Sequence, residues 1–339
     1  MTRLLKHHTT PVTQPTVGVD GEPGAALDVQ DLHVRYRRGT HAVRGVSLSI
    51  EPGRCLAVVG ESGSGKSTIA LALLGLLPAG THCSGSAQVQ GQQLVGVSQR
   101  DLRAVRGCTI GYVGQDPMRS FDPLYSVGAS VAEAWRARGQ RPPAGEVTNA
   151  LEELGIADAA RRARLRAHQW SGGMLQRAAI AAANAHGPCL IIADEPTSAL
   201  DADRADSVLS SLRSTQVAVL LISHDLALVG RHSDTVAVMY AGRIVEHGPA
   251  ERVLTHPRHP YTAALLAASP RLGAGLPVPL PGAPPRLDVD PEGCAFAPRC
   301  VHAQDHCRAR DPEFSDDVAC VRHRELRLTV ANDVAGTGS

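Results

Sequence analysis

Residues 60–67 have the sequence Gly-Glu-Ser-Gly-Ser-Gly-Lys-Ser, the most informative eight residues of the chain. It follows an apolar run, Cys55–Val59, that suits a buried strand, and it precedes a helical pattern at residues 68–77. Glycines in such a loop allow backbone angles at which successive N–H groups point at anionic oxygens, and the N-terminus of the following helix adds its dipole. The stretch therefore predicts a strand–loop–helix unit that binds phosphate.

The residues of this loop have separate expected roles. We expect Lys66 to reach the β- and γ-phosphates of a nucleotide and Ser67 to bind Mg²⁺, with Thr68 in support. Arginine supplies almost all the positive charge of the chain, and Lys66 is one of only two lysines. A lysine kept here suits a position where a compact ammonium must fit between phosphates. The other nucleotide-binding residues predicted in the loop are Gly60, Ser62, Gly63 and Gly65.

A second apolar stretch, residues 189–193, ends in the carboxylates Asp194 and Glu195. Adjacent residues at a strand end point in different directions, which suits two distinct roles. Asp194 fits a ligand of Mg²⁺, bound directly or through water, and Glu195 fits a general base that positions the attacking water. The alternative is a solvated acidic turn before Pro196. The phosphate-binding loop upstream favours the catalytic interpretation.

A third signature lies far downstream of the loop, at residues 171–177, and reads Ser-Gly-Gly-Met-Leu-Gln-Arg. The two signatures and the carboxylate pair together resemble the ATP-binding cassette (ABC) family over about residues 27–270. In that family the downstream signature contacts a nucleotide held by a different cassette. The resemblance therefore implies ATP hydrolysis at the interface of two cassettes, with trans contacts from Ser171, Gly172, Gly173 and Gln176.

The same resemblance assigns roles to four more residues. Gln115 matches the glutamine that senses Mg²⁺ and the γ-phosphate, and His224 matches the histidine that contacts the γ-phosphate during hydrolysis. Asp201 falls in the loop that crosses the cassette interface, and Tyr36 lies where an aromatic ring stacks on adenine. Trp170 departs from the family, which usually carries leucine there, but the phosphate-contacting tripeptide stays intact.

The apolar pattern predicts an α/β fold. Continuous apolar strands at residues 55–59, 109–113, 189–193 and 217–222 alternate with helical stretches, as in a parallel sheet covered on both faces. Residues 27–36 and 42–50 alternate apolar and polar side chains like antiparallel strands, and residues 235–240 and 243–246 suit a hairpin. The resemblance implies a P-loop NTPase with a RecA-like parallel core sheet, an antiparallel β-subdomain and an α-helical signature subdomain.

We expect three regions along the chain. Residues 1–26, rich in Thr, Pro and Gly, form a disordered N-terminal tail. Residues 27–255 form the nucleotide-binding domain, with its helical subdomain at about 116–172. Residues 256–339 form a C-terminal extension that includes a Pro- and Gly-rich linker and a small Cys-rich segment.

Composition limits the compartment and the partners. The 339 residues are 43% hydrophobic and carry a net charge of +1, so no strong field attracts nucleic acid. No apolar run approaches the roughly 20 residues that cross a bilayer, and the N-terminus lacks the apolar core of a secretory signal, so we expect a cytosolic protein. A chromosome-type cassette ATPase is disfavoured because residues 118–169 are too few for a long coiled coil. Intact Glu195 and His224 argue against a redox regulator that binds nucleotide only secondarily.

The C-terminal extension indicates a branch of the family. Residues 259–266, His-Pro-Tyr-Thr-Ala-Ala-Leu-Leu, and Ser269-Pro270 resemble the ending of oligopeptide and dipeptide permease ATPases, and residues 115–123 and Met174 resemble the peptide and nickel importer branch. The resemblance implies an ATPase at the cytoplasmic face of the cell membrane, paired with a second ATPase subunit, either a copy or a homologue. It also implies two transmembrane permease subunits and, indirectly, an extracytoplasmic solute-binding protein. Peptide cargo and a nickel or other metal chelate both stay open, as does a soluble non-transport ATPase.

Four of the eight cysteines are clustered, with the spacing C-x5-C-x6-C-x12-C: Cys294, Cys300, Cys307 and Cys320. A cytosolic setting disfavours disulfides, and the close Cys pairs typical of zinc sites are absent, so the spacing leaves an iron–sulfur cluster and other metals open. Residues 293–300 resemble the iron–sulfur tail of dipeptide permease ATPases, which implies that the four thiolates hold a [4Fe-4S] cluster. Alternative ligands nearby are His302, His306 and His323.

Overall fold

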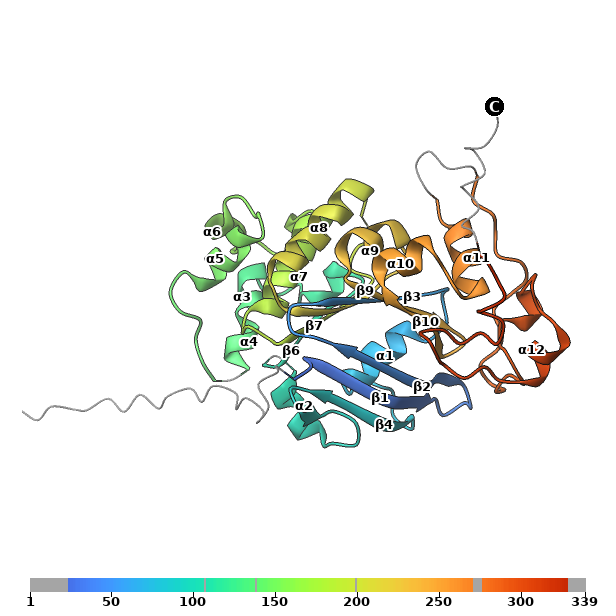
Figure 1. The fold of residues 1–339 in the computed structure, drawn as a ribbon. Coiled ribbons are helices and arrows are strands. Elements are labelled where there is room, and N and C mark those ends of the chain that lie inside the picture. The colour runs from blue at the N-terminus through green and yellow to red at the C-terminus, as the bar shows by residue number, and fades with distance from the viewer. Residues whose placement is uncertain (1–23, 107, 138, 199, 271–275, 329–339) are drawn as a thin grey trace, which may run out of the picture.

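The computed structural model describes residues 24–106, 108–137, 139–198, 200–270 and 276–328, which fold around two β-sheets (Figure 1). The larger sheet has six strands in the order β10-β9-β3-β8-β7-β6. Neighbouring strands are parallel except for the terminal hairpin, which confirms the predicted parallel core sheet and its hairpin. The strands are β3 (Cys55–Val59), β6 (Ile110–Val113), β7 (Leu190–Asp194), β8 (Ala218–Ile222), β9 (Thr235–Tyr240) and β10 (Arg243–Pro249).

The smaller sheet is antiparallel and has the order β2-β1-β4-β5. Its strands are β1 (Leu27–Arg35), β2 (His41–Ile50), β4 (His82–Val89) and β5 (Gln92–Gln93). The first two follow the alternating pattern seen in the sequence. The sequence did not indicate β4, because its residues are mostly small and polar and do not alternate with apolar ones.

Helices cover both faces of the six-stranded sheet. Helix α1 lies between the two sheets, and α7 to α10 lie on the opposite face (Figure 1). The helices are α1 (Lys66–Leu73), α2 (Gln99–Val105), α3 (Val127–Val131), α4 (Glu133–Arg136), α5 (Glu146–Glu153), α6 (Ala159–Arg162), α7 (Gly172–Asn184), α8 (Ala202–Ser214), α9 (Leu226–His232), α10 (Ala250–Thr255), α11 (Pro260–Ala268) and α12 (Asp305–Ala309). None of these described helices combines the length and apolar character that a membrane span requires.

The central strands are apolar at every position because both of their faces pack into buried cores. In β3, Leu56 and Val58 pack with α1 and the smaller sheet, whereas Ala57 and Val59 pack with the helices on the other side. Successive side chains of a strand point to opposite faces, so a sheet that is covered twice needs apolar residues at every position. The strand that carries the phosphate-binding loop is thereby held between two buried layers.

The start of the fold differs slightly from the prediction. Residues 1–23 of the expected tail lie outside the described residues. Ala26, which we assigned to the tail, is only 3% exposed. Its N–H donates to the carbonyl of Ile50 over 2.8 Å, so Ala26 is bonded to the end of β2 just before β1 begins.

The C-terminal extension is fixed to the edge of the six-stranded sheet. Glu246 of β10 is fully buried and accepts hydrogen bonds from Arg252 and from the backbone N–H groups of Arg258 and His259. The N–H of Ala319 donates to the carbonyl of Val245, which joins the Cys-rich segment to the same strand. The helices α5 and α6 and the Cys-rich segment around α12 lie at opposite ends of the molecule (Figure 1).

Candidate nucleotide-binding site

The phosphate-binding loop connects β3 to α1, as predicted, and its glycines are required by close backbone contacts. Gly60 has φ of 153° and Gly65 has φ of 109°. A Cβ atom would collide with the carbonyl oxygen of Met239 at the first position and with that of Ala42 at the second. Because both obstacles are backbone atoms, the loop cannot make room for a larger residue. Helix α1 begins directly after Gly65, so its first N–H groups face the loop.

Lys66 lies inside the loop and is 6% exposed. Its Nζ donates to the carbonyls of Gly60 and Glu61 over 2.8 and 2.9 Å. Burial lowers the pKa of Lys66, and the nearby carboxylates Glu195, Asp194 and Glu61 oppose that shift. The ammonium group is thus already placed among acceptors that phosphate oxygens can replace.

Ser67 and Asp194 come together across 127 residues of sequence. The Ser67 Oγ donates to Asp194 Oδ1 over 3.0 Å. Burial raises the pKa of Asp194, while the Ser67 hydrogen bond lowers it. A hydroxyl and a carboxylate oxygen at the end of β7, next to a phosphate-binding loop, fit the ligands that Mg²⁺ takes beside nucleotide phosphates.

The predicted general base, Glu195, meets the two residues predicted to contact or sense the γ-phosphate. Gln115 Nε2 donates to Glu195 Oε2 over 3.3 Å, and His224 Nδ1 lies 3.4 Å from the same oxygen. Glu195 has φ of 48°, a left-handed conformation that is uncommon for a non-glycine residue and is often found at functional sites. One carboxylate thus lies between the ends of three strands, β6, β7 and β8.

Tyr36 lies just after β1, and its hydroxyl is 3.1 Å from the Thr68 Oγ1. This contact joins the loop after β1 to the first turn of α1. Stacking of the Tyr36 ring on adenine stays a prediction.

The signature residues lie apart from this group. Ser171 is the N-cap of α7, where its side chain accepts from the N–H of Met174, and Asp201 caps α8 in the same way through Arg204. In the described part of the chain, no hydrogen bond or ion pair joins Ser171, Gly172, Gly173 or Asp201 to the phosphate-binding loop. Such a separation is what a role in a second cassette's site requires.

Two neighbours of the signature are buried. Gln176 is 1% exposed and donates to the carbonyl of Gly114, so it anchors the segment before Gln115, and a trans contact by its side chain would require it to move. Trp170 is 7% exposed and packs in the core beside α7. The departure from leucine at position 170 is thus accommodated by packing.

The four clustered cysteines line a single small cavity, together with His259 and His302. Burial raises the pKa of Cys294 to about 11. Burial also raises the pKa of Cys320, and the nearby thiols of Cys300 and Cys307 raise it further. Residues 24–328, within the described ranges, contain no group of three or more His, Cys, Asp or Glu side chains placed to hold a metal ion. The thiols are therefore gathered around one space without being arranged as ligands.

Two residues that the sequence did not mark as functional reach the phosphate-binding loop. Arg299 forms a two-pronged ion pair with Glu61, and the Tyr261 hydroxyl accepts from the Glu61 backbone N–H over 2.8 Å. Glu61 occupies a variable position of the loop motif, and Arg299 lies 238 residues away. No local pattern in the sequence could have paired them.

Comparisons with known proteins agree with this geometry. The family described as "ABC transporter" matches residues 43–198, and the family described as "Oligopeptide/dipeptide transporter, C-terminal region" matches residues 245–307. A dipeptide transport ATP-binding protein, DppD, of Bacillus subtilis is 40% identical over 296 residues, covering 83% of this chain and 88% of the relative. The chain belongs to the ABC transporter ATPases of the oligopeptide/dipeptide branch.

Two further matches show how much of each known protein this chain covers. An oligopeptide transport ATP-binding protein, OppD, of Mycobacterium bovis is 42% identical over 327 residues, which cover 91% of this chain but 53% of the relative. The chain thus spans about half the length of that ABC transporter ATPase. The solved structure of cbiO1 from Clostridium perfringens, part of the ABC transporter complex cbiONQ, is 29% identical with a TM-score of 0.59 and covers 68% of this chain and 90% of that one.

Proposed function

We propose that this chain binds and hydrolyses ATP at the interface of two cassettes and thereby drives the uptake of di- or oligopeptides across the cytoplasmic membrane. The observation that carries the proposal is the grouping of Ser67 with Asp194, and of Gln115 and His224 with Glu195, beside the phosphate-binding loop. Ser171, Gly172 and Gly173 make no hydrogen bond to that loop within the described residues, which leaves them for a second cassette. The match of residues 245–307 to the oligopeptide/dipeptide C-terminal region supports the transport role.

The proposal assigns a residue to each step of hydrolysis. The loop N–H groups and Lys66 hold the phosphates of ATP, and Ser67 and Asp194 are the residues that would hold Mg²⁺. When bound, Mg²⁺ neutralises charge on the phosphate oxygens. Glu195 accepts the proton of the attacking water, while His224 and Gln115 keep its carboxylate oriented. Ser171 and Gly173 of the second cassette complete the site from the other side.

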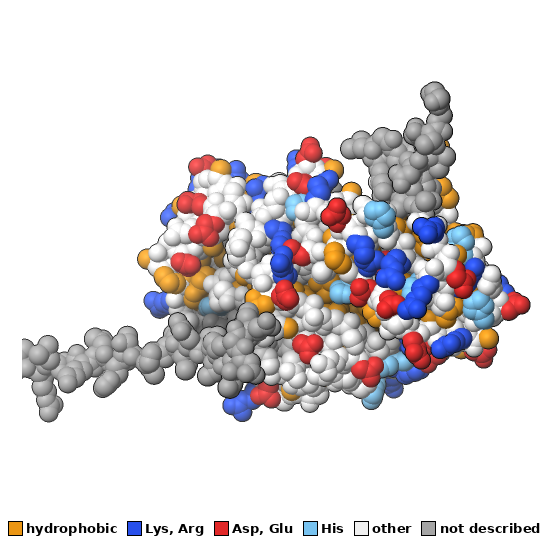
Figure 2. Space-filling model, viewed as in Figure 1, with side chains coloured by type: hydrophobic (Ala, Val, Ile, Leu, Met, Phe, Trp, Pro, Cys, Tyr) orange, Lys and Arg blue, Asp and Glu red, His pale blue; other side chains and the backbone are white. Residues whose placement is uncertain are grey.

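The proposal places the protein at the cytoplasmic face of the membrane, bound to two permease subunits that receive substrate from a solute-binding protein. Exposed apolar side chains near Gln115 support such a contact: Met118 is 47%, Leu124 is 73% and Tyr125 is 58% exposed. Movement at Gln115 would reach the permeases through this surface. The face in Figure 2 carries acidic and basic side chains side by side, which suits a protein partner better than nucleic acid.

A strain that lacks this gene tests the proposal. We expect loss of labelled di- and tripeptide uptake, restored by the wild-type chain and not by Glu195→Gln. Nickel uptake is measured in the same strain, because loss of nickel uptake with normal peptide uptake would favour the second candidate cargo, a metal chelate. Normal uptake of both peptide and nickel in the deletion strain would refute an import function.

We further propose that Cys294, Cys300, Cys307 and Cys320 hold a [4Fe-4S] cluster, because all four line one cavity. The described thiols are not spaced as metal ligands, so they would have to rearrange to hold it. The cluster would act as a structural clip for a segment with few apolar residues. Cys300→Ser should remove iron and brown colour from anaerobically purified protein, whereas Cys83→Ser, outside the cavity, should retain both. Stoichiometric zinc without iron in the wild-type protein would contradict the assignment.

A further inference from the structure

The Cys-rich segment touches the phosphate-binding loop directly, through Arg299. This residue ends a short 3-10 turn (Ala297–Arg299) between Cys294 and Cys300. Its Nη1 and Nη2 donate to the two carboxylate oxygens of Glu61 over 2.6 and 3.0 Å. The Arg299 side chain is 5% exposed and that of Glu61 is 22% exposed. Short, bidentate contacts of this kind are strong and specific in direction.

The guanidinium group has little freedom to move. Arg299 Nε donates to the carbonyl of Pro281 over 2.7 Å, and Nη1 also lies 3.3 Å from the Tyr240 hydroxyl. The group lies 5.8 Å from the ring centre of Tyr240 and 5.9 Å from that of Phe296. Hydrogen bonds to Glu61 and Tyr240 raise the pKa of Arg299. The Glu61 carboxylate is therefore bound by a guanidinium group whose position is fixed by Pro281, Tyr240 and Phe296.

The backbone of Glu61 in turn bonds to other parts of the loop and to α11. Its N–H donates to the hydroxyl of Tyr261 in α11. Its carbonyl accepts from the Ser64 N–H over 3.2 Å and from Lys66 Nζ over 2.9 Å. One residue thus connects the C-terminal extension to both the turn of the loop and the lysine expected to bind phosphate. A shift of the Glu61 side chain would change the directions of these donors.

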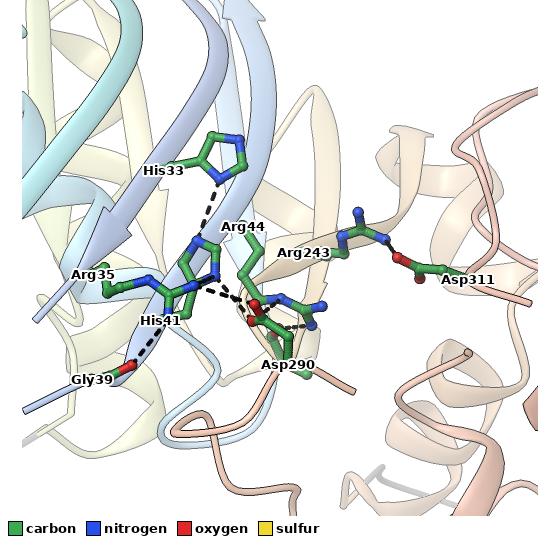
Figure 3. A network of polar contacts seen from close by, with 9 residues as sticks. His33, Arg35, Gly39, His41, Arg44, Arg243, Asp290 and Asp311 are labelled. Carbon is green, nitrogen blue, oxygen red and sulfur yellow. Dashed lines mark hydrogen bonds and ion pairs between the residues drawn. The ribbon is translucent and has the colours of Figure 1, made fainter. Parts of the chain in front are cut away.

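A second contact joins the extension to β1 and β2 of the smaller sheet. Asp290 lies among Arg35, His41 and Arg44, at distances of 3.2, 3.0 and 3.3 Å (Figure 3). The His41 N–H also donates to the carbonyl of Leu287 over 2.7 Å. Arg35 and His41 flank the turn that follows Tyr36. The extension therefore contacts the cassette at two places, the phosphate-binding loop and the turn that follows Tyr36.

We propose that Arg299 is a positioning residue for nucleotide binding: through Glu61 it holds the phosphate-binding loop in its binding conformation and makes ATP affinity depend on the fold of the Cys-rich segment. This inference rests on the proposed binding of ATP at residues 60–67, which is measured separately in the unchanged protein.

The test compares Arg299→Gln, Glu61→Gln and the double variant in the full chain. We expect the Kd of a fluorescent ATP analogue, and KM for ATP, to rise about tenfold in each single variant, the scale of one charge-assisted hydrogen bond. The kcat at saturating ATP should change little, because Glu195 and His224 are untouched. The double variant should be no worse than either single one, since both changes remove the same interaction. Arg299→Lys, which keeps the charge, should recover part of the affinity.

Arg243→Gln is the matched control. It breaks an ion pair between Arg243 and Asp311 that also joins the extension to the cassette but does not touch the loop. ATP affinity should stay at the wild-type value in this variant. If Arg299→Gln does not fold, Glu61→Gln still removes the ion pair, and it does so at the more exposed of the two side chains.

Wild-type ATP affinity in Arg299→Gln or Glu61→Gln, an equal loss in Arg243→Gln, or additive losses in the double variant would each overturn the inference. Failure of the unchanged protein to bind ATP would instead refute the proposed function.

Discussion

Glu195→Gln should abolish ATP turnover and leave ATP binding intact. The substitution keeps the size of the side chain and an oxygen that can accept from Gln115, which lies 3.3 Å away. It removes only the ability to take a proton from water. Loss of a general base costs about 10²–10⁴ in rate, or about 2.7–5.4 kcal/mol of transition-state stabilisation. Binding should persist because the contacts from the loop and Lys66 are unchanged.

Two measurements on the same protein check this prediction: phosphate release at saturating Mg-ATP and the Kd of a fluorescent ATP analogue. Glu152→Gln, the same chemical change at an exposed position of α5, should behave like the wild-type protein in both. Hydrolysis in Glu195→Gln within a factor of two or three of wild type would refute the role of Glu195. Loss of nucleotide binding would show instead that the carboxylate organises the site before chemistry.

Three other perturbations have expected outcomes. Lys66→Ala should weaken ATP binding itself, measured by the same fluorescence titration; unchanged affinity would contradict its contact with phosphate. Glu246→Ala should lower the free energy of unfolding in urea by about 3–5 kcal/mol, because it leaves Arg252, the part-buried N–H of Arg258 and the buried N–H of His259 without their acceptor. Burial lowers the pKa of His259 from 6.5 to about 3, so the folded state binds fewer protons than the unfolded state between these values. Neutral, buried His259 therefore contributes to the free energy of unfolding above pH 6.5, and this contribution is lost as the pH falls toward 3. His259→Asn, which can still cap α11, should therefore lose less thermal stability than wild type between pH 7 and 5; an equal loss would exclude His259 as a source of the acid sensitivity.

Local chemistry explains what could be predicted at the site. The phosphate-binding loop needs consecutive residues of defined type, because its N–H groups come from one turn of backbone. Asp194 and Glu195 are likewise neighbours at a strand end. That Gln115 and His224 would meet Glu195 followed from the family resemblance, and the structure brings the three together across the ends of β6, β7 and β8.

Contiguous patterns of apolar and polar side chains predicted the α/β core, the loop at residues 60–67 and the carboxylate pair Asp194 and Glu195, whereas Gln115 and His224 were expected from the family resemblance. Only the tertiary structure decided that Gln176 is buried, that β4 pairs with β1, and that Arg299 holds Glu61. The physical reason is separation along the chain. Arg299 and Glu61 are 238 positions apart, and they meet because the extension packs on β10. The sequence around either residue does not indicate which residue it will contact.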